Sequence, residues 1–401
     1  MSFNPLQEKG IPLEKQLRNW SELNVKPYDK NSVHPYSRTR GIFMNGIEVE
    51  GVIFSHQFSR HSPDMAVNQM LAMTRRVEQQ QQKAINWLIP GNESVLEVTI
   101  GYEQVAVDLT AFLARTEPDP YVKAALDFAL LEDFDHLYRY ANLLNMVQGK
   151  AAEEITGKYT EITVGRPTML EHRHPGDDVR KHYDAKTADP LTKLHVLTIT
   201  AAEQQTMNFY MNVGNRPEEM LGRGLYLEIG MIEEQHVTHY ASLADPRESW
   251  FEKLVMHEYN ECWLYHSMME QEPDPQVKKI WELHLAMEIE HLRLACELMK
   301  KMMRMDPESM LPKQLPAPLI FESNIDYVRS ILAEQADFNA QGTEFVPGDQ
   351  VPKNSNYHMY QEVVNAGGVP SEEVIEKHVQ GKGKDYRQEL KGPHPVERFR
   401  S

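Results

Sequence analysis

The stretch that decides the fold is residues 203–291, in which one pattern of charged residues occurs twice. Glu203 is followed by Glu233-Glu-Gln-His236, and Glu258 is followed by Glu288-Ile-Glu-His291. From Glu203 to Glu233 is 30 positions (233−203), and from Glu258 to Glu288 is again 30 (288−258). Each member lies in a segment with helical periodicity. The Glu and His of Glu-x-x-His are three residues apart, so they project from one helical face and can hold one ion together.

The spacing also predicts where the chain turns. In an antiparallel helical hairpin, positions at equal height add up to a constant. Glu203 and the midpoint of positions 233 and 236 centre a turn near 218.75, beside Asn215-Arg-Pro-Glu-Glu219. The second pair centres a turn near 273.75, inside Glu272-Pro-Asp-Pro275. Both centres are turn-like and contain proline. Each Glu should therefore stand level with its Glu-x-x-His partner, as in the ligand set of a carboxylate-bridged two-metal site in a helical bundle.

The same pattern recurs earlier in the chain at a constant offset. The phrase Glu-Pro-Asp-Pro stands at 117–120 and again at 272–275, an offset of 155 (272−117). A shift of 155 aligns further residues without a gap: Glu48 with Glu203, Glu78 with Glu233, Glu103 with Glu258, Asp133 with Glu288, and His136 with His291. The first-half hairpins are then centred near 63.75 and 118.75, again on proline-containing turns. The chain is therefore predicted to be a tandem duplication, each half being four helices in two hairpins.

Two departures from the pattern fall in the first half. Gln81 stands where His236 stands in the second half, and Asp133 replaces Glu288. Asp is a competent but shorter ligand, whereas Gln81 is at best a weak neutral one. A site containing hairpin 48–81 is therefore expected to be single-metal, weakened or vestigial.

Composition narrows the possible partners and location. The chain has 401 residues, 41% hydrophobic and 25% charged, and a net charge of −17 that argues against nucleic acid and anionic membranes. No run of about 18 apolar residues and no signal peptide is present. The hairpin register places Cys262 and Cys296 at different heights, which predicts no disulfide between them. We expect a soluble cytoplasmic protein without a nucleic-acid or membrane partner.

The predicted organisation has five segments. They are an N-terminal arm (1–46), a first repeat (47–146), a crossover connector (147–189), a second repeat (190–304) and a C-terminal extension (305–401). The connector suits a crossover that runs the length of a bundle. The extension has helical candidates near 322–337, 355–366 and 370–379 and is expected to pack around the bundle or onto a second subunit. Its end, from Gly381, is expected to be mobile.

The paired motifs resemble the ferritin-like di-iron carboxylate superfamily, most nearly its rubrerythrin-type and oxygenase branches. The resemblance covers roughly residues 47–304. It implies an all-α fold of duplicated ferritin-like four-helix bundles, with about eight core helices in four antiparallel hairpins. In that family carboxylates bridge two irons, or manganese, and His supplies terminal nitrogens. The matching residues are Glu48, Glu78, Glu103, Asp133, His136, Glu203, Glu233, His236, Glu258, Glu288 and His291.

A single Glu-x-x-His is most often a solvated surface pattern, because charged residues are mostly exposed. Four hairpins that obey one spacing rule are a far more specific signal. Glu48 and Glu78 are the weaker matches, because their hairpin lacks the histidine.

Which hairpins share a site stays open from the sequence. Short turns at 89–93 and 244–248 make consecutive hairpins within one half run parallel, whereas the family pairs antiparallel hairpins. This favours sites shared between halves, with hairpin 94–146 paired either with 190–243 or with 248–304. Against this, both departures lie in the first half, as expected if only the second half kept a complete site.

The resemblance implies an oxidoreductase whose iron or manganese pair activates O2 or peroxide and uses an electron donor. Oxidation of a small organic substrate is the first hypothesis, because the arm and connector could build a pocket that a bare bundle lacks. The alternatives are iron handling or peroxide detoxification without an organic substrate, and a structural protein with vestigial ligands. No catalytic residue is assigned, and a homodimer is expected. Tyrosines that could line the site or relay electrons are Tyr102, Tyr226, Tyr240 and Tyr259.

Overall fold

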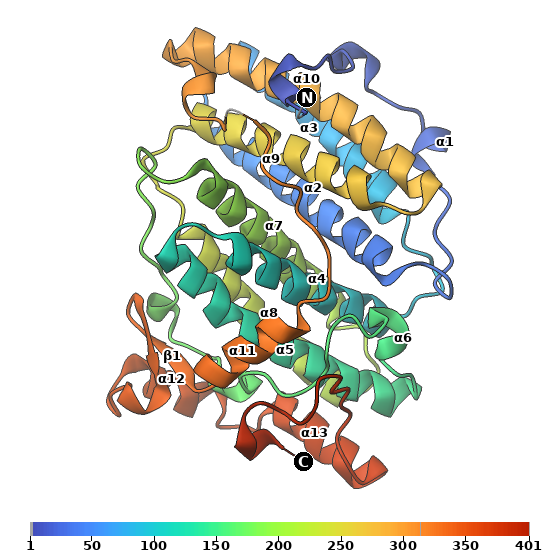
Figure 1. Cartoon of the computed structure of the whole chain (residues 1–401), viewed down its shortest axis with the longest axis vertical. Coiled ribbons are helices and arrows are strands. Elements are labelled where there is room, and N and C mark those ends of the chain that lie inside the picture. The colour runs from blue at the N-terminus through green and yellow to red at the C-terminus, as the bar shows by residue number, and fades with distance from the viewer. Residues whose placement is uncertain (1–2, 313, 401) are drawn as a thin grey trace. The chain divides into compact units, whose positions relative to one another are not determined.

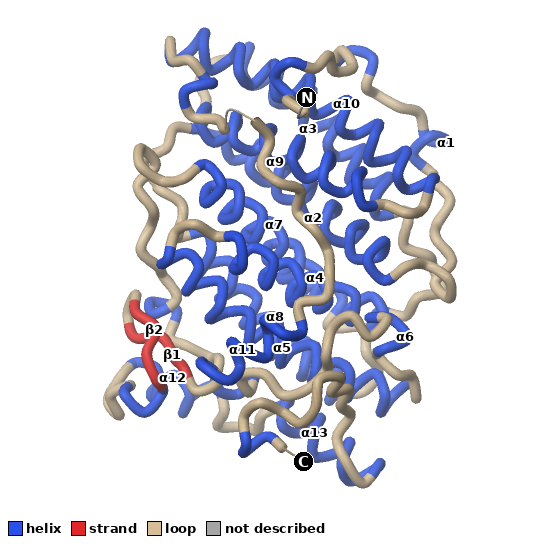
Figure 2. The backbone as a smooth tube through the Cα atoms, in the orientation of Figure 1, coloured by secondary structure: helices blue, strands red, loops and turns tan. Residues whose placement is uncertain are grey.

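The structure, a computed structural model, describes residues 3–312 and 314–400. Its regular secondary structure is almost entirely helical, which confirms the predicted all-α class (Figures 1 and 2). The chain divides into two compact units, each made of three segments. Unit 1 comprises Met1–Asn92, Tyr183–Ala202 and Asp245–Ile320. Unit 2 comprises Glu93–His182, Glu203–Ala244 and Phe321–Ser401.

Unit 1 is built on two helical hairpins. Its long helices are α2 (Pro35–His61), α3 (Met65–Asn86), α9 (Trp250–Gln271) and α10 (Pro275–Met303). Helix α2 packs against α3 and α9, and α10 packs against α9 and α3 (Figure 1). The N-terminal arm, with 3-10 turns at Pro5–Gln7 and Leu13–Lys15 and helix α1 (Trp20–Leu23), lies against α10 and α3. The first part of α7 (Pro190–Val213) also belongs to this unit.

Unit 2 contains the other long helices and the C-terminal extension. Its helices are α4 (Val95–Thr116), α5 (Pro120–Gln148), α6 (Glu153–Thr156), the rest of α7, α8 (Met220–Ala241), α11 (Ile325–Gln335), α12 (Asn356–Val364) and α13 (Pro370–Lys382). Helix α4 packs against α5, α5 against α8, and α13 against both α5 and α8. The extension therefore packs around the helices of its own chain, the first of the two predicted alternatives. The core includes Leu131, Tyr140, Ile229 and Val374.

Local sequence signals set the ends of the long helices. The hydroxyls of Ser94 and Ser249 cap α4 and α9, and Glu97 and Glu252 complete both capping boxes. Helices α5 and α10 begin with proline at their first position, each preceded by an aspartate cap. The predicted hairpin turns near 63.75, 118.75, 218.75 and 273.75 all fall between consecutive long helices, which confirms them.

Helix α2 starts earlier than the apolar pattern predicts. It begins at Pro35 rather than near residue 47, so the helix takes in the last part of the segment predicted as an arm. Most residues of 36–46 are buried although several are polar, and Arg40 Nε lies 2.8 Å from Glu272 Oε2. Apolar periodicity fails here because buried polar side chains find partners inside the unit.

The sequence pattern does not predict the β-hairpin of the extension. Strands β1 (Phe338–Gln341) and β2 (Glu344–Pro347) pair antiparallel, with Phe338 opposite Pro347 (Figure 2). Gly342 takes a positive φ of 56° in the two-residue loop, as the tight hairpin turns require. The sequence feature that indicates this hairpin is a glycine between two runs of alternating residues. Each run is too short to be distinguished from loop sequence.

The end of the chain is packed rather than mobile, so that expectation is wrong. The backbone of Gln388 pairs with that of Ile162 through two hydrogen bonds of 2.7 and 3.1 Å. The Tyr386 hydroxyl accepts a hydrogen bond of 3.0 Å from the backbone N–H of Ala152. The mostly polar composition of this segment predicts that it is mobile. A few of its side chains, Tyr386 and Phe399 among them, nevertheless pack against the core of unit 2.

Two further expectations can be compared with the structure. Cys262 and Cys296 are both free thiols, as the hairpin register predicts. Within residues 3–312 and 314–400, every helix is too short or too polar to span a lipid bilayer.

The compact units do not coincide with the two predicted repeats, because each unit takes one hairpin from each repeat.

Candidate metal centres

In unit 2, six buried side chains from four helices converge on one place. Ligand atoms of Asp133, Glu203, Glu233 and His236 lie within 4.8 Å of one another, and so do those of Glu103, His136 and Glu233. Glu233 belongs to both groups, so its carboxylate joins them. The six residues come from α4, α5, α7 and α8, and none is more than 1% exposed.

Both imidazoles of this cluster turn Nδ1 inward. His236 Nδ1 lies 3.2 Å from Asp133 Oδ1 and 3.6 Å from Glu233 Oε2, while His136 Nδ1 lies 3.0 Å from Glu233 Oε1. The outer nitrogens face carboxylates: His236 Nε2 is 2.9 Å from Glu132, and His136 Nε2 is 2.9 Å from Glu171. An acceptor on Nε2–H fixes the tautomer and leaves the Nδ1 lone pair free to bind a cation.

Several carboxylate oxygens in the cluster have no hydrogen-bond partner. They are Glu103 Oε2, both oxygens of Asp133, both oxygens of Glu203 and Glu233 Oε2. An unpaired buried carboxylate is costly, because the protein interior does not replace the lost hydration. Bound cations would satisfy these oxygens, and carboxylate oxygen together with imidazole nitrogen is a donor set that divalent metal ions accept.

The pKa shifts of the carboxylates in unit 2 also indicate a site suited to a cation. Burial raises the pKa of Glu103 and Glu203 well above the ordinary value, and burial also raises the pKa of Asp133. Burial opposes ionisation of Glu233 as well, but hydrogen bonds from His136 and His236 outweigh it and lower its pKa to about 2. Without a cation, the cluster must therefore hold protons on several carboxylates.

Unit 1 contains a second cluster, on α2, α3, α9 and α10. Ligand atoms of Glu78, Glu258 and His291 lie within 4.8 Å of one another, and so do those of Glu48, Glu261 and Glu288. The two groups meet where His291 Nδ1 lies 2.9 Å from Glu288 Oε2. The outer nitrogen of His291 is 2.7 Å from Gln16 Oε1, on the N-terminal arm.

In unit 1, Gln81 occupies the position that corresponds to His236 of unit 2. Gln81 is buried, and its Nε2 donates a 2.5 Å hydrogen bond to Glu288 Oε1 while its Oε1 has no hydrogen-bond partner. Glu48, Glu78, Glu258 and Glu261 each also keep one unpartnered oxygen. Burial raises the pKa of Glu78 to about 7. Burial and the neighbouring carboxylates raise the pKa of Glu48, Glu258 and Glu261 well above the ordinary value.

Every residue predicted as a ligand from the sequence lies in one of these two clusters. The pairing of hairpins is the cross-half arrangement: hairpin 94–146 shares its cluster with 190–243, and the hairpin of α2 and α3 shares the other with α9 and α10. The two departures consequently fall in different units. Gln81 is in unit 1 and Asp133 is in unit 2, so neither cluster is built from second-half residues alone.

Three groups of residues at the clusters were missed by sequence reasoning. Glu261 is the first, and its signal is Glu258-Tyr-Asn-Glu261, two carboxylates three residues apart on one helical face. Tyr210 and Tyr265 are the second: their hydroxyls donate hydrogen bonds to Glu103 and Glu48, respectively. Each tyrosine follows the Glu on its own helix by seven positions (210−203 and 265−258), which is two turns along the same face.

The tyrosines named from the sequence make other contacts. The hydroxyls of Tyr226 and Thr99 are 2.6 Å apart, and the Tyr102 hydroxyl lies 3.5 Å from Gln205 Oε1. Both side chains are buried in unit 2. Their hydroxyls therefore contact Thr99 and Gln205, which are not members of the cluster.

The connector supplies the third missed group. Glu171 accepts from His136, and Arg166 and Arg173 pair with Glu132, which in turn faces His236. Arg173 is 1% exposed and its side chain binds both oxygens of Glu132, at 2.5 and 3.0 Å. Burial opposes ionisation of Glu132, but Arg173, His236 and Arg166 together lower its pKa well below the ordinary value. The connector therefore sets the charge behind both imidazoles of unit 2.

This network predicts a large stability effect. Glu132→Ala should lower the free energy of unfolding of the metal-free protein by about 3–5 kcal/mol, because the buried Arg166 loses its ion pair and the buried Arg173 keeps only its pair with Asp178. Glu322→Ala is the matched control, because its pair with Arg115 is exposed (38% and 45%). The control should cost no more than about 1 kcal/mol. Urea unfolding of both variants measures the difference, and equal effects would contradict the role of the network.

The fold and the clusters together define an all-helical protein with two buried sets of carboxylate and imidazole side chains that could hold metal ions. A search of protein-family models, curated proteins and solved structures finds no match to this chain.

Proposed function

We propose that the chain is a dimetal-carboxylate oxidoreductase of the ferritin-like class, most simply di-iron, that activates O2 or peroxide. The observation that carries the proposal is the position of Glu233. Its carboxylate belongs to two ligand groups at once, and an inward-facing imidazole nitrogen stands in each of them. A carboxylate shared in this way is what two adjacent ions need as a bridge.

The ferritin-like and duplicated character of the fold belongs to the same proposal. The bounds of α3, α4 and α5 become those of α8, α9 and α10 when 155 is added, from Met65 to Met220 through Gln148 to Met303. Helices α2 and α7 both begin at prolines 155 residues apart (190−35). A repeat of helix ends, caps and turns at one offset supports descent from a duplicated pair of hairpins.

In this proposal the chain's own residues hold and shield the ions. In unit 2, Glu103 and His136 would hold one ion, and Asp133, Glu203 and His236 would hold the other, with Glu233 shared by the two groups. Bound iron would supply the electrons that O2 or peroxide takes up, and a donor would restore them. The Tyr210 hydroxyl, which donates to Glu103, places a proton beside the site, and complete burial keeps bulk water away.

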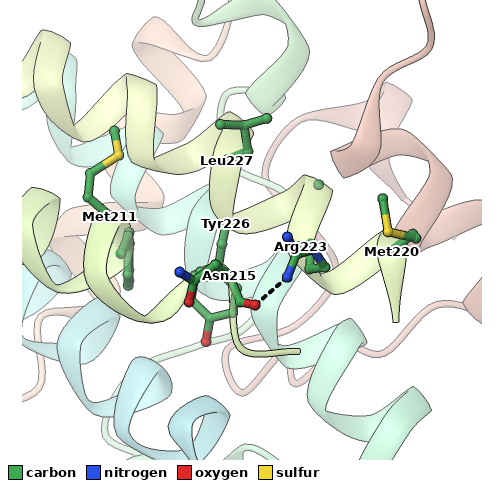
Figure 3. A pocket seen from close by; sticks show the side chains of 9 residues that line it. Met211, Asn215, Met220, Arg223, Tyr226 and Leu227 are labelled. Atoms are coloured by element: carbon green, nitrogen blue, oxygen red, sulfur yellow. Dashed lines mark hydrogen bonds between the residues drawn. The ribbon is translucent and has the colours of Figure 1, made fainter. Parts of the chain in front are cut away.

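A pocket in unit 2 favours an organic substrate over iron handling. It has a volume of about 320 Å³ and is lined mainly by apolar and aromatic side chains between α7 and α8 (Figure 3). Met211, Met220 and Leu227 surround it, with Arg223 hydrogen bonded to the backbone of Asn215 (Figure 3). Tyr210 also lines the pocket, so one side chain links the pocket to Glu103. An acidic, narrow channel would instead favour iron entry.

Metal content tests the proposal directly. Protein purified without oxygen, or metal-free protein reconstituted with Fe(II), should hold about four ions per chain, two for each cluster. Elemental analysis gives the stoichiometry, and the optical spectrum after oxygen addition reports oxidation of carboxylate-bound iron. Protein that binds neither Fe(II) nor Mn(II) would refute the proposal and leave a helical scaffold.

The reaction with oxygen separates the two candidate activities. A substrate oxidase should oxidise only the iron that it binds and then wait for a donor. An iron-handling protein should continue to oxidise Fe(II) added in large excess, with release or mineralisation of ferric iron. Following oxygen uptake against added Fe(II), and repeating the experiment with hydrogen peroxide, distinguishes these outcomes.

A further inference from the structure

We propose that the two clusters select different metals: unit 1 has one all-oxygen position that takes Mn(II), and the positions that contain imidazole take iron. The inference rests on the proposed dimetal function and adds a division of roles between the clusters. It begins with oxygens of Glu48, Glu261 and Glu288, which lie within 4.8 Å of one another. All three side chains are at most 3% exposed.

Gln81 adds a fourth oxygen where unit 2 has a nitrogen. It is the counterpart of His236 at the offset of 155, it is 2% exposed, and its Oε1 has no hydrogen-bond partner. Its Nε2 is held by Glu288, so the amide oxygen is the atom left over. Glu48 Oε2 and Glu261 Oε2 are buried without partners as well. Gln81 contacts the group through Glu288, and Gln81, Glu48 and Glu261, from three helices, each have one buried oxygen without a partner.

The space for Glu261 comes from a glycine on the facing helix. A Cβ on Gly51 would lie 3.0 Å from Glu261 Oε1, tighter than ordinary side-chain contact. At the offset of 155, Gly51 corresponds to Thr206 and Glu261 corresponds to Ala106. Unit 2 therefore has neither the extra carboxylate nor the glycine that makes room for it. The loss of a histidine in unit 1 is accompanied by the gain of a carboxylate and of the space that holds it.

The remaining imidazole of unit 1 is also a weaker donor than those of unit 2. His291 has a neutral partner on its outer nitrogen, the Gln16 amide oxygen at 2.7 Å. In unit 2 the outer partners are carboxylates, Glu171 and Glu132, each at 2.9 Å. A carboxylate behind an imidazole raises the basicity of the ligating nitrogen, whereas an amide does so much less.

All of these differences favour Mn(II) relative to iron in unit 1, compared with unit 2. Imidazole strengthens binding of iron relative to manganese, whereas carboxylate and carbonyl oxygens suit Mn(II). Replacement of a carboxylate-backed imidazole by two oxygens narrows the general preference for iron at one position of unit 1. In equal Fe(II) and Mn(II), unit 1 is therefore the cluster that takes up manganese beside iron, whereas unit 2 fills with iron.

The test measures metal content and does not depend on activity. Two full-length variants each report on one cluster: Glu233→Ala with His236→Ala leaves unit 1, and Glu288→Ala with His291→Ala leaves unit 2. Both are made metal-free, equilibrated without oxygen in equal Fe(II) and Mn(II), and freed of unbound metal. The Mn:Fe ratio should be at least about tenfold higher in the variant that keeps unit 1, the scale of a ligand-environment change.

Single substitutions in the unit 1 reporter then locate the effect. Gln81→His should lower the Mn:Fe ratio about tenfold, whereas Gln79→His, a matched change two residues away on α3 and outside the cluster, should leave it unchanged. Glu261→Ala should remove about one manganese per chain and keep the ion at His291, visible as loss of the Mn(II) electron paramagnetic resonance signal. Circular dichroism shows whether Gln81→His impairs folding. If it does, the manganese content of Glu261→Ala tests the all-oxygen position instead.

Each outcome bears on a different claim. Equal Mn:Fe ratios in the two reporters, with metal bound by both, would overturn the division of metals and leave the dimetal function intact. Full manganese retention in Glu261→Ala would overturn the all-oxygen position. Absence of both metals from the unaltered protein would overturn the dimetal function and this inference together.

Discussion

Replacing Glu233 and His236 together by alanine is expected to remove both metal ions from unit 2 and to leave those of unit 1. Glu233 belongs to both ligand groups of unit 2, and His236 Nδ1 is surrounded by oxygens of Asp133, Glu203 and Glu233 at 3.2–3.7 Å. Loss of the shared carboxylate removes a ligand from each ion at once, so metal content should fall by about half, from about four to about two ions per chain.

The fold should survive this change in the metal-free protein. The double change removes Glu233 together with His236, one of the two imidazoles that stabilise its charge, and it relieves the repulsion that Glu233 exerts on Glu103 and Glu203. Glu234→Ala is the matched control, because Glu234 is the exposed neighbour on the same helix. Elemental analysis and circular dichroism of both variants measure the result. A double variant that kept its metal would show that this cluster is not the binding site.

Removal of the metals is expected to destabilise the protein, and more strongly at pH 8 than at pH 6. In the metal-free protein burial raises the pKa of Glu78 from 4.5 to about 7, and Glu48, Glu103, Glu203 and Glu258 shift in the same direction. The folded state then binds protons that the unfolded state has released. Their contribution to stability is complete below pH 4.5 and is lost as the pH rises through 7.

The other shifted groups of the clusters do not reverse this trend. Burial lowers the pKa of His136 and His236, but neighbouring carboxylates, chiefly Glu171 for His136 and Asp133 for His236, outweigh it and raise both pKa values, which also favours the folded state at lower pH. Glu233 has a lowered pKa of about 2, and the stability that it contributes is lost only as the pH falls below 4.5 toward 2, outside this window. Metal binding gains from higher pH, because protons no longer compete for the ligands.

Thermal unfolding of dialysed metal-free and Fe(II)-loaded protein, both without oxygen, measures this effect at the two pH values. At a free metal concentration about 1,000-fold above the dissociation constant, each site should add about 4 kcal/mol to the free energy of unfolding. The double variant of Glu233 and His236 should show a smaller gain, because only unit 1 can bind. A gain from metal that is the same at pH 6 and pH 8, or larger at pH 6, would contradict the proton-linked picture.

Much of the fold could be predicted because its signals are local. The ends of the long helices are set by Ser94, Ser249, the prolines of α5 and α10, and the Asp residues before them. Capping and proline geometry act within a few residues, so they can be read without knowing what lies nearby. The positions of the turns could be predicted as well. The rise per residue is the same in both helices of a hairpin, so residues at equal height add up to a constant that locates the turn.

The same local reasoning failed where burial involves polar groups. The start of α2 at Pro35 was hidden because Arg38, Arg40 and Asn45 are buried with partners in unit 1. Glu171 and Arg173 lie in a connector whose polar sequence gives no sign that both are buried behind the imidazoles of unit 2. A partner 35 positions away along the chain, as His136 is from Glu171, leaves no periodic trace in the sequence, and neither does one 232 positions away, as Glu272 is from Arg40.

The sequence by itself determined the helical class, the turns and the set of candidate ligands, because each depends on spacing along one helix or one hairpin. Only the tertiary structure decided which hairpins meet, that Gln81 and Asp133 belong to different clusters, and that Glu261 joins the cluster that lacks a histidine. Those outcomes depend on contacts between segments about 100 to 200 residues apart, which are fixed by how the helices pack in three dimensions and not by the order of residues along any one of them.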